Sequence, residues 1–145
     1  MANNDIMNTH LSIINVNMIK IINAFSGLSV DDLGKAKEFY TTTLGLELED
    51  ERMGLTLVLP SGGKLFIYPK KDHQAATYTV LNFVVDDITQ TVDVLTEQGV
   101  TFERYPGTPH DENGIVRPPD ASFGPAIAWF KDPAGNILSI IEANK

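Results

Sequence analysis

The chain lacks cysteine entirely, and this absence excludes several kinds of chemistry. Without cysteine there is no disulfide, no thiolate nucleophile and no zinc or iron–sulfur site with sulfur ligands. Long hydrophobic runs are also missing, since no stretch approaches the roughly 18 apolar residues of a membrane-spanning helix. The first residues lack the basic start of a signal peptide. These absences favour a cytoplasmic protein with no membrane partner.

Basic residues are few, with 11 Lys and Arg against 19 Asp and Glu, which gives a formal net charge of −8. The only short basic run is Lys70-Lys71. Because phosphate backbones are bound by clustered lysine and arginine, this composition argues against nucleic acid as a partner. The acidic balance is typical of a soluble surface and would also favour a cationic ligand. A chain of 145 residues is long enough for one domain with a full core.

The most informative feature that is present is an internal repeat. Val30-Asp31-Asp32-Leu33 and Val85-Asp86-Asp87-Ile88 lie 55 positions apart, and each is predicted to open a helix. Either aspartate of each pair is a suitable N-cap. Gly45 and Gly99 supply the two C-terminal stops. A repeat of this period indicates one supersecondary unit that is used twice.

Hydrophobic periodicity predicts the same order of elements in both halves, a strand, a helix and then further strands. The strands are expected over residues 19–29, 46–49, 55–59 and 64–68, and then over 78–85, 100–104, 126–131 and 136–141. Residues 69–77 link the halves. Residues 1–17 are predicted to be an N-terminal extension, for which a peripheral strand and a disordered arm both remain open.

The segment over residues 105–125 breaks the symmetry between the halves. It holds five of the eight prolines, where the first half has only a short turn. Loops of this length are uncommon in compact domains and are often lids or binding loops. The loop could be a lid over a binding site or a flexible surface loop without a role in binding, and both interpretations remain open.

These features together resemble the vicinal-oxygen-chelate superfamily, which includes glyoxalase I, extradiol dioxygenases and bleomycin-resistance proteins. The likeness spans about residues 19–143 and is carried by the duplicated helix starts, Phe39-Tyr40, Leu44-Gly45-Leu46 and Asp132-Pro133-Ala134-Gly135-Asn136. It implies an α+β fold, with two βαβββ modules over 18–70 and 78–143 in one domain, 18–145, that cup a cavity. It also implies a homodimer, because such sheets often complete their cavities across a subunit boundary.

In the metal-dependent members of this superfamily, four His or Glu side chains hold a divalent ion. The motif spacing of the family places the corresponding positions at Phe25, Ile67, Val80 and Ser139. Three of these side chains have no lone pair, and a serine hydroxyl alone is a poor ligand. We therefore expect no metal and no cofactor. Glyoxalase I and extradiol dioxygenase activities are not expected either, since both use the metal.

Strand alternation puts Phe25, Ser29, Val80, Asn82 and Ser139 on one face, which the resemblance makes the lining of the cavity. A mostly apolar lining with isolated polar points suits a small organic ligand. The other interpretation is that the same residues pack against one another in a closed core and leave no cavity. The full set of candidate ligand-binding residues is Phe25, Ser29, Ile67, Tyr68, Val80, Asn82, Trp129, Ser139, Asp111 and Arg117.

Several of these candidates have an alternative role. Trp129 is the only tryptophan and could stack on a planar ligand or pack in the core, and Tyr68 has the same ambiguity. Asp111 and Arg117 would contact a ligand if the long loop closed. His110-Asp111-Glu112 is predicted to be solvated surface rather than a metal site. His10, His73 and His110 form no constellation in the sequence, and no catalytic residue can be assigned.

Three functions fit these patterns. The favoured one is a metal-free protein that binds or sequesters a small organic molecule in a cavity. The second is a metal-independent enzyme of the same superfamily, an isomerase or lyase. The third is a structural or regulatory module in which Phe25, Ile67 and Val80 fill the cavity.

Overall fold

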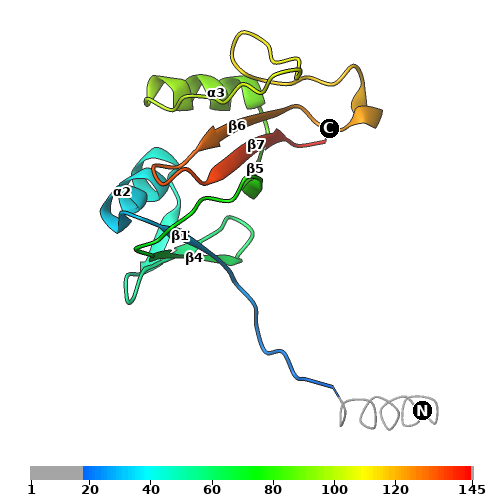
Figure 1. Ribbon diagram of the computed structural model, residues 1–145. Helices are drawn as coiled ribbons and strands as arrows, with labels where there is room; N and C mark the ends of the chain where they lie inside the picture. Colours follow the sequence, from blue (N-terminus) through cyan, green and yellow to red (C-terminus); the bar gives the residue numbers. More distant parts are fainter. Residues whose placement is uncertain (1–17, 145) are drawn as a thin grey trace, which may run out of the picture.

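The computed structural model describes residues 18–144, so the predicted extension over residues 1–17 lies outside the described part (Figure 1). Two separate β-sheets, each accompanied by its own helix, make up this part of the chain. This is the α+β architecture that the sequence predicts. None of the helices within residues 18–144 has the length and apolar character needed to cross a membrane.

The first sheet has four strands in the order β1-β4-β3-β2, with β1 parallel to β4 and the other pairs antiparallel. Its elements are β1 (Ser26–Val30), α2 (Leu33–Lys37), the π-helix η1 (Glu38–Thr43), β2 (Glu47–Asp50), β3 (Leu55–Val58) and β4 (Lys64–Pro69). The first strand was expected from residue 19 but begins only at Ser26. Because Ser26 already pairs with Leu65 near the start of β4, the residues before it have no partner strand in this sheet.

The second sheet has three strands in the order β5-β7-β6, with β5 parallel to β7 and β6 antiparallel to β7. Its elements are β5 (Thr79–Val85), α3 (Ile88–Glu97), the short 3-10 helix η2 (Ala121–Phe123), β6 (Ile127–Lys131) and β7 (Ile137–Glu142).

The strand predicted over residues 100–104 was wrong. One bridge between Phe102 and Phe130 forms there, and then the chain leaves the sheet. The long loop returns to make a second bridge, between Val116 and Ile127, so it occupies the edge where a fourth strand was expected. Ile115 of this loop is fully buried in the core. The loop is therefore anchored to the edge of the second sheet.

Both helices begin as the repeat predicts, and the structure selects the second aspartate of each pair as the N-cap. The Asp32 side chain accepts a hydrogen bond from the Lys35 N–H, and the Asp87 side chain accepts one from the Gln90 N–H, each at 3.0 Å. The cap satisfies a backbone donor that has no partner inside the helix.

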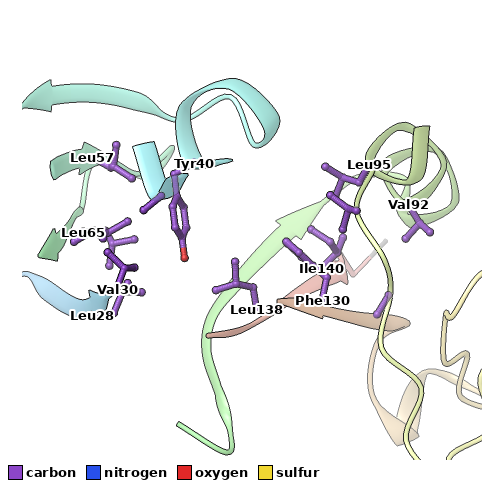
Figure 2. Close-up of a cluster of buried hydrophobic side chains, with 14 of the residues drawn as sticks. Leu28, Val30, Tyr40, Leu57, Leu65, Val92, Leu95, Phe130, Leu138 and Ile140 are labelled. Atoms are coloured by element: carbon purple, nitrogen blue, oxygen red, sulfur yellow. The ribbon is translucent and has the colours of Figure 1, made fainter. Parts of the chain in front are cut away.

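One hydrophobic core spans both halves. Figure 2 shows side chains from the first sheet, from Tyr40 of η1, from the second sheet and from α3 within the same cluster. The strands contribute alternate residues to it, as the burial patterns of β3, β4 and β6 show. Each sheet therefore has an inner face against this core and an outer face turned away from it.

A buried polar contact joins the two halves. The Tyr40 hydroxyl donates a hydrogen bond of 2.7 Å to Asp132 in the β6–β7 turn. Burial, together with the nearby Asp132 carboxylate, raises the pKa of Tyr40, so its hydroxyl stays protonated and can donate. The Asn136 amide also donates to the Ser29 carbonyl oxygen of β1, at 2.9 Å. These contacts fix the second turn against the first module.

Candidate functional site

Three of the candidate ligand-binding residues form a row across the outer face of the second sheet. Strand register places Asn82 of β5 beside Ser139 of β7, and Ser139 beside Trp129 of β6. The Ser139 hydroxyl is fully buried and donates to Asn82 Oδ1 at 2.5 Å. The Trp129 indole N–H donates to Thr79 Oγ1 at 3.2 Å. We call Asn82, Ser139 and Trp129 the polar–aromatic row.

Two further rings gather at the Trp129 end of this row. The Tyr105 ring centroid lies 5.5 Å from the Trp129 centroid and the His110 centroid 6.1 Å, both with edge-to-face geometry. The His110 ring is held by the backbone, because Nε2 accepts from the Tyr105 N–H and Nδ1 donates to the Gly114 carbonyl. His110 is therefore a packing residue of this aromatic cluster, and both of its nitrogens are already used.

The outer face of the first sheet carries a second aromatic patch. Ser29 of β1 pairs with Tyr68 of β4, and Gly27 pairs with Phe66. The Phe66 and Tyr68 rings are stacked with centroids 5.9 Å apart, and the Phe25 ring meets the Phe66 ring edge-on at 6.4 Å. Phe25 and Tyr68 are both exposed. The candidates Phe25, Ser29 and Tyr68 thus lie together, with Phe66 as a member that the sequence did not indicate.

Ile67 is a correction to the candidate set. Its side chain is fully buried in the core on the inner face, and the neighbouring Phe66 takes the outer position. The sequence-based prediction of Ile67 matched the turn of the first module to the turn of the second by aligning Gly63 with Gly135. The backbone hydrogen bonds that close the two turns, Asp132 N–H to Asn136 O and Leu59 N–H to Gly63 O, instead align Gly63 with Asn136. The predicted position was therefore one residue too far along β4.

Val80 also lies differently from the expectation. An irregularity between Thr79 and Leu81 interrupts the pairing of β5 with β7, and the Val80 side chain packs against the core cluster. Thr79, which receives the Trp129 hydrogen bond, takes the place expected of Val80. A bulge of this kind inserts one extra residue and so shifts strand alternation.

Asp111 and Arg117 contact each other and other residues in or beside the long loop. Arg117 donates to the Thr89 hydroxyl at 2.6 Å and lies 3.5 Å from the Asp111 carboxylate. Although partial burial opposes it, hydrogen bonds from the Ile115 and Asn113 N–H groups and the Arg117 guanidinium lower the pKa of Asp111. Arg117 lines a separate groove of about 470 Å³ beside Glu142. None of these contacts joins either residue to the polar–aromatic row.

One contact brings together two residues that the sequence left apart. The Ser29 hydroxyl lies 2.7 Å from His73 Nδ1, and His73 Nε2 lies 3.0 Å from the Ala134 carbonyl oxygen. Since a carbonyl only accepts, Nε2 donates to Ala134, and Nδ1 is hydrogen-bonded to the Ser29 hydroxyl. His73 therefore joins β1 to the β6–β7 turn. The linker position of His73 gave no signal of this contact.

The residues at the family's metal positions do not fit a divalent ion. With Phe66 in place of Ile67 and Thr79 in place of Val80, the four positions hold Phe25, Phe66, Thr79 and Ser139, and only two neutral hydroxyls offer a donor atom. The Thr79 hydroxyl already accepts from Trp129. The Ser139 hydroxyl is committed to Asn82. Within residues 18–144, no three His, Asp or Glu side chains come together in a group that could hold a metal.

The sequence and the fold place this chain in a known family. Residues 20–140 match the family model of the Glyoxalase/Bleomycin resistance protein/Dioxygenase superfamily, so the chain belongs to this superfamily. This confirms both the resemblance and the fold class that the sequence predicts. No curated protein matches the sequence.

Solved structures of the same fold include proteins with differing descriptions. The fosfomycin resistance protein FosX from Listeria monocytogenes superposes with a TM-score of 0.65 at 15% identity, covering 88% of this chain and 96% of its own. A superfamily member from Sphaerobacter thermophilus DSM 20745 gives 0.62 at 26% identity, covering 84% and 98%. TnmS3, an antibiotic binding protein from Streptomyces sp. CB03234, gives 0.58 at 24% identity, covering 87% and 100%.

Proposed function

We propose that this protein binds or sequesters a small organic molecule, without a metal, on the outer faces of its two sheets. The observation that carries the proposal is the polar–aromatic row. The Ser139–Asn82 hydrogen bond, which is buried on the Ser139 side and exposed on the Asn82 side, lies directly beside Trp129 and its aromatic neighbours. A few fixed polar groups among apolar and aromatic side chains are typical of small-molecule sites.

The second part of the proposal is that the site is completed by a homodimer of a single-domain chain, 18–145. The two half-sites are the polar–aromatic row and the aromatic patch of Phe25, Phe66 and Tyr68. Each is supplied by a different sheet, and exposed apolar side chains remain at both, Phe25 on the first sheet and Val84 on the second. Exposed apolar clusters of this kind often mark binding surfaces.

The ligand class follows from the chemistry of these residues. Stacking on Trp129, Phe66 or Tyr68 suits a planar or aromatic compound. The net charge of −8 favours one that carries positive charge. The antibiotic-binding description of TnmS3 supports an antibiotic or a similar secondary metabolite as the ligand. A cytoplasmic location is part of the same proposal.

The single tryptophan offers a direct test, because Trp129 is the only source of indole fluorescence and lies in the row. We expect titration with a panel of aromatic antibiotics to reveal at least one compound that quenches this emission saturably. Asn82→Leu removes the polar end of the row and should weaken that compound about tenfold or more, the effect of losing one hydrogen bond of roughly 1.4 kcal/mol.

Thr96→Ala, on the exposed side of α3, is the matched control and should leave the affinity unchanged. Circular dichroism of both variants checks that they are folded. If Asn82→Leu bound the quenching compound as tightly as the parent protein, the row would not be the site. If no compound in the panel quenched Trp129, the proposed ligand class would be contradicted.

A further inference from the structure

Ser29 and His73 have the arrangement of a nucleophile and its base. The Ser29 hydroxyl lies 2.7 Å from His73 Nδ1, within hydrogen-bond distance. His73 Nε2 lies 3.0 Å from the Ala134 carbonyl oxygen, which orients the ring. A serine beside a base, with that base oriented by a third group, is the general signature of an activated nucleophile. The backbone carbonyl here takes the orienting place that a carboxylate has in the serine–histidine–aspartate triad.

The bond to Ala134 decides which nitrogen of the ring can act as the base. Because a carbonyl oxygen only accepts, Nε2 is the nitrogen that donates to it. In the neutral ring the lone pair is then on Nδ1, the nitrogen that faces the serine hydroxyl. An imidazole in this orientation can take the hydroxyl proton while the serine oxygen attacks a carbonyl carbon.

The pair lies at the outer face of the first sheet and not in the core. Ser29 is half-buried in β1, between Leu28 and Val30, whose side chains are buried in the core on the inner face. His73 is also half-buried and lies in the linker that follows β4. Since both side chains are partly exposed to solvent, a small molecule on the outer face can approach the pair.

The neighbours of Ser29 suit a flat, aromatic group. Tyr68 lies opposite Ser29 in the strand pairing, is 37% exposed and stacks on Phe66 with ring centroids 5.9 Å apart. Gly27 comes two residues before Ser29 on the same face. A Cβ placed on Gly27 would come no closer than 3.6 Å to the Phe66 carbonyl oxygen and 3.9 Å to the Tyr68 ring. Bare backbone beside two aromatic rings forms a surface on which a planar group can pack.

A backbone donor is also available at Ser29. The Val30 carbonyl accepts from the Lys70 N–H at 2.9 Å on the β4 side, so Ser29, one residue earlier, turns its backbone groups to the other side. On that side the Ser29 carbonyl accepts from the Asn136 amide at 2.9 Å. Among residues 18–144, the Ser29 N–H makes no hydrogen bond outside the strands. The N–H of a nucleophilic serine can stabilise the negative charge that develops on the attacked carbonyl oxygen.

We infer that Ser29 is the nucleophile of an acyl-transfer reaction, with His73 as its general base and an ester of an aromatic acid or alcohol as the substrate. The Ser29 oxygen bonds to the ester carbonyl carbon while its proton passes to His73 Nδ1. The bond from that carbon to the alcohol oxygen then breaks, and the alcohol leaves with the proton from His73. Water attacks the acyl-serine in the same way, so that ester and water give acid and alcohol.

This inference goes beyond the proposed binding function. Ser29 acts on a molecule at the aromatic patch of Phe25, Phe66 and Tyr68, whether or not the polar–aromatic row holds one. The quenching of Trp129 reports the row and does not depend on a nucleophile. The two proposals therefore fail separately.

Labelling with phenylmethanesulfonyl fluoride tests the nucleophile, because this aromatic probe bonds to an activated serine oxygen and releases fluoride. We expect the full chain to gain the mass of one phenylmethanesulfonyl group, which peptide mapping places on Ser29. Ser29→Ala should abolish the label, and His73→Asn should slow its formation about 100-fold, the low end of the contribution of a general base. Ser26→Ala is the matched control, since it removes an exposed serine from the start of the same strand and should leave labelling unchanged.

Hydrolysis of 4-nitrophenyl benzoate gives a second readout with the same variants. The parent chain and Ser26→Ala should release 4-nitrophenolate at least about tenfold faster than Ser29→Ala or His73→Asn. Circular dichroism checks that every variant is folded. A parent chain that takes no label would overturn the inference, and so would labelling or ester hydrolysis that persists undiminished in Ser29→Ala.

Discussion

Asp132→Ala is expected to lower the free energy of unfolding by about 3 to 5 kcal/mol, with a fall in Tm of roughly 10 °C. The Asp132 carboxylate is 4% exposed. It accepts four hydrogen bonds, from the Tyr40 hydroxyl, the Ala134 N–H, and the backbone and side-chain amides of Asn136. Its removal leaves the buried Tyr40 hydroxyl without an acceptor and frees the β6–β7 turn.

Tyr40→Phe isolates one part of this network, because it removes one donor and leaves the turn intact. Its cost should be about 1.5 to 3 kcal/mol, the value of one hydrogen bond to a charged group. Asp93→Ala, on the exposed side of α3, is the control and should change stability by less than about 0.5 kcal/mol. Urea unfolding followed by circular dichroism measures all three. An Asp132→Ala cost no larger than that of Tyr40→Phe would contradict this role of the turn.

Phe130→Ala should destabilise the protein by a similar amount, about 3 to 5 kcal/mol. Phe130 is fully buried on the inner face of β6. Its ring centroid lies 6.2 Å from Phe39 of η1 and 5.6 Å from Phe102. The ring therefore joins the first module's helix to the second sheet, and its truncation leaves a cavity where the two modules meet.

Phe130→Leu keeps most of the volume, so it should cost less than about 1.5 kcal/mol. Phe123→Ala is the matched control, because this side chain is 71% exposed in η2 and its loss should be nearly neutral. Differential scanning calorimetry should show one transition for each variant, since a single core spans both modules. Two separated transitions in Phe130→Ala would mean that the modules unfold independently.

The repeat was sufficient to predict the class of fold and the order of the elements, except for the strand expected over residues 100–104, which does not form. The periodicity and the two aspartate pairs are local signals, and capping is decided within one helical turn. The match of residues 20–140 to the superfamily confirms this interpretation. The choice of Asp32 and Asp87 as the caps needed the structure, since both aspartates of each pair suit the role.

The site was predicted in part, and each departure has a local cause. Strand alternation in the sequence predicted that Asn82 and Ser139 share one face of the sheet. The strand register in the structure shows that Trp129 lies on that face as well. One residue of difference between two turns moved Ile67 into the core, and a bulge moved Val80. The contact of Ser29 with His73 joins positions 44 residues apart and leaves no pattern in the sequence. Such contacts depend on how the modules pack.

Native mass spectrometry of the protein as purified, repeated after incubation with nickel and zinc, tests the central claim most directly. The proposed function predicts a dimer that carries an organic adduct, with no stoichiometric divalent metal and no glyoxalase I turnover after either incubation. One tightly held metal ion per site, retained through buffer exchange, would contradict the argument from Phe25, Phe66, Thr79 and Ser139.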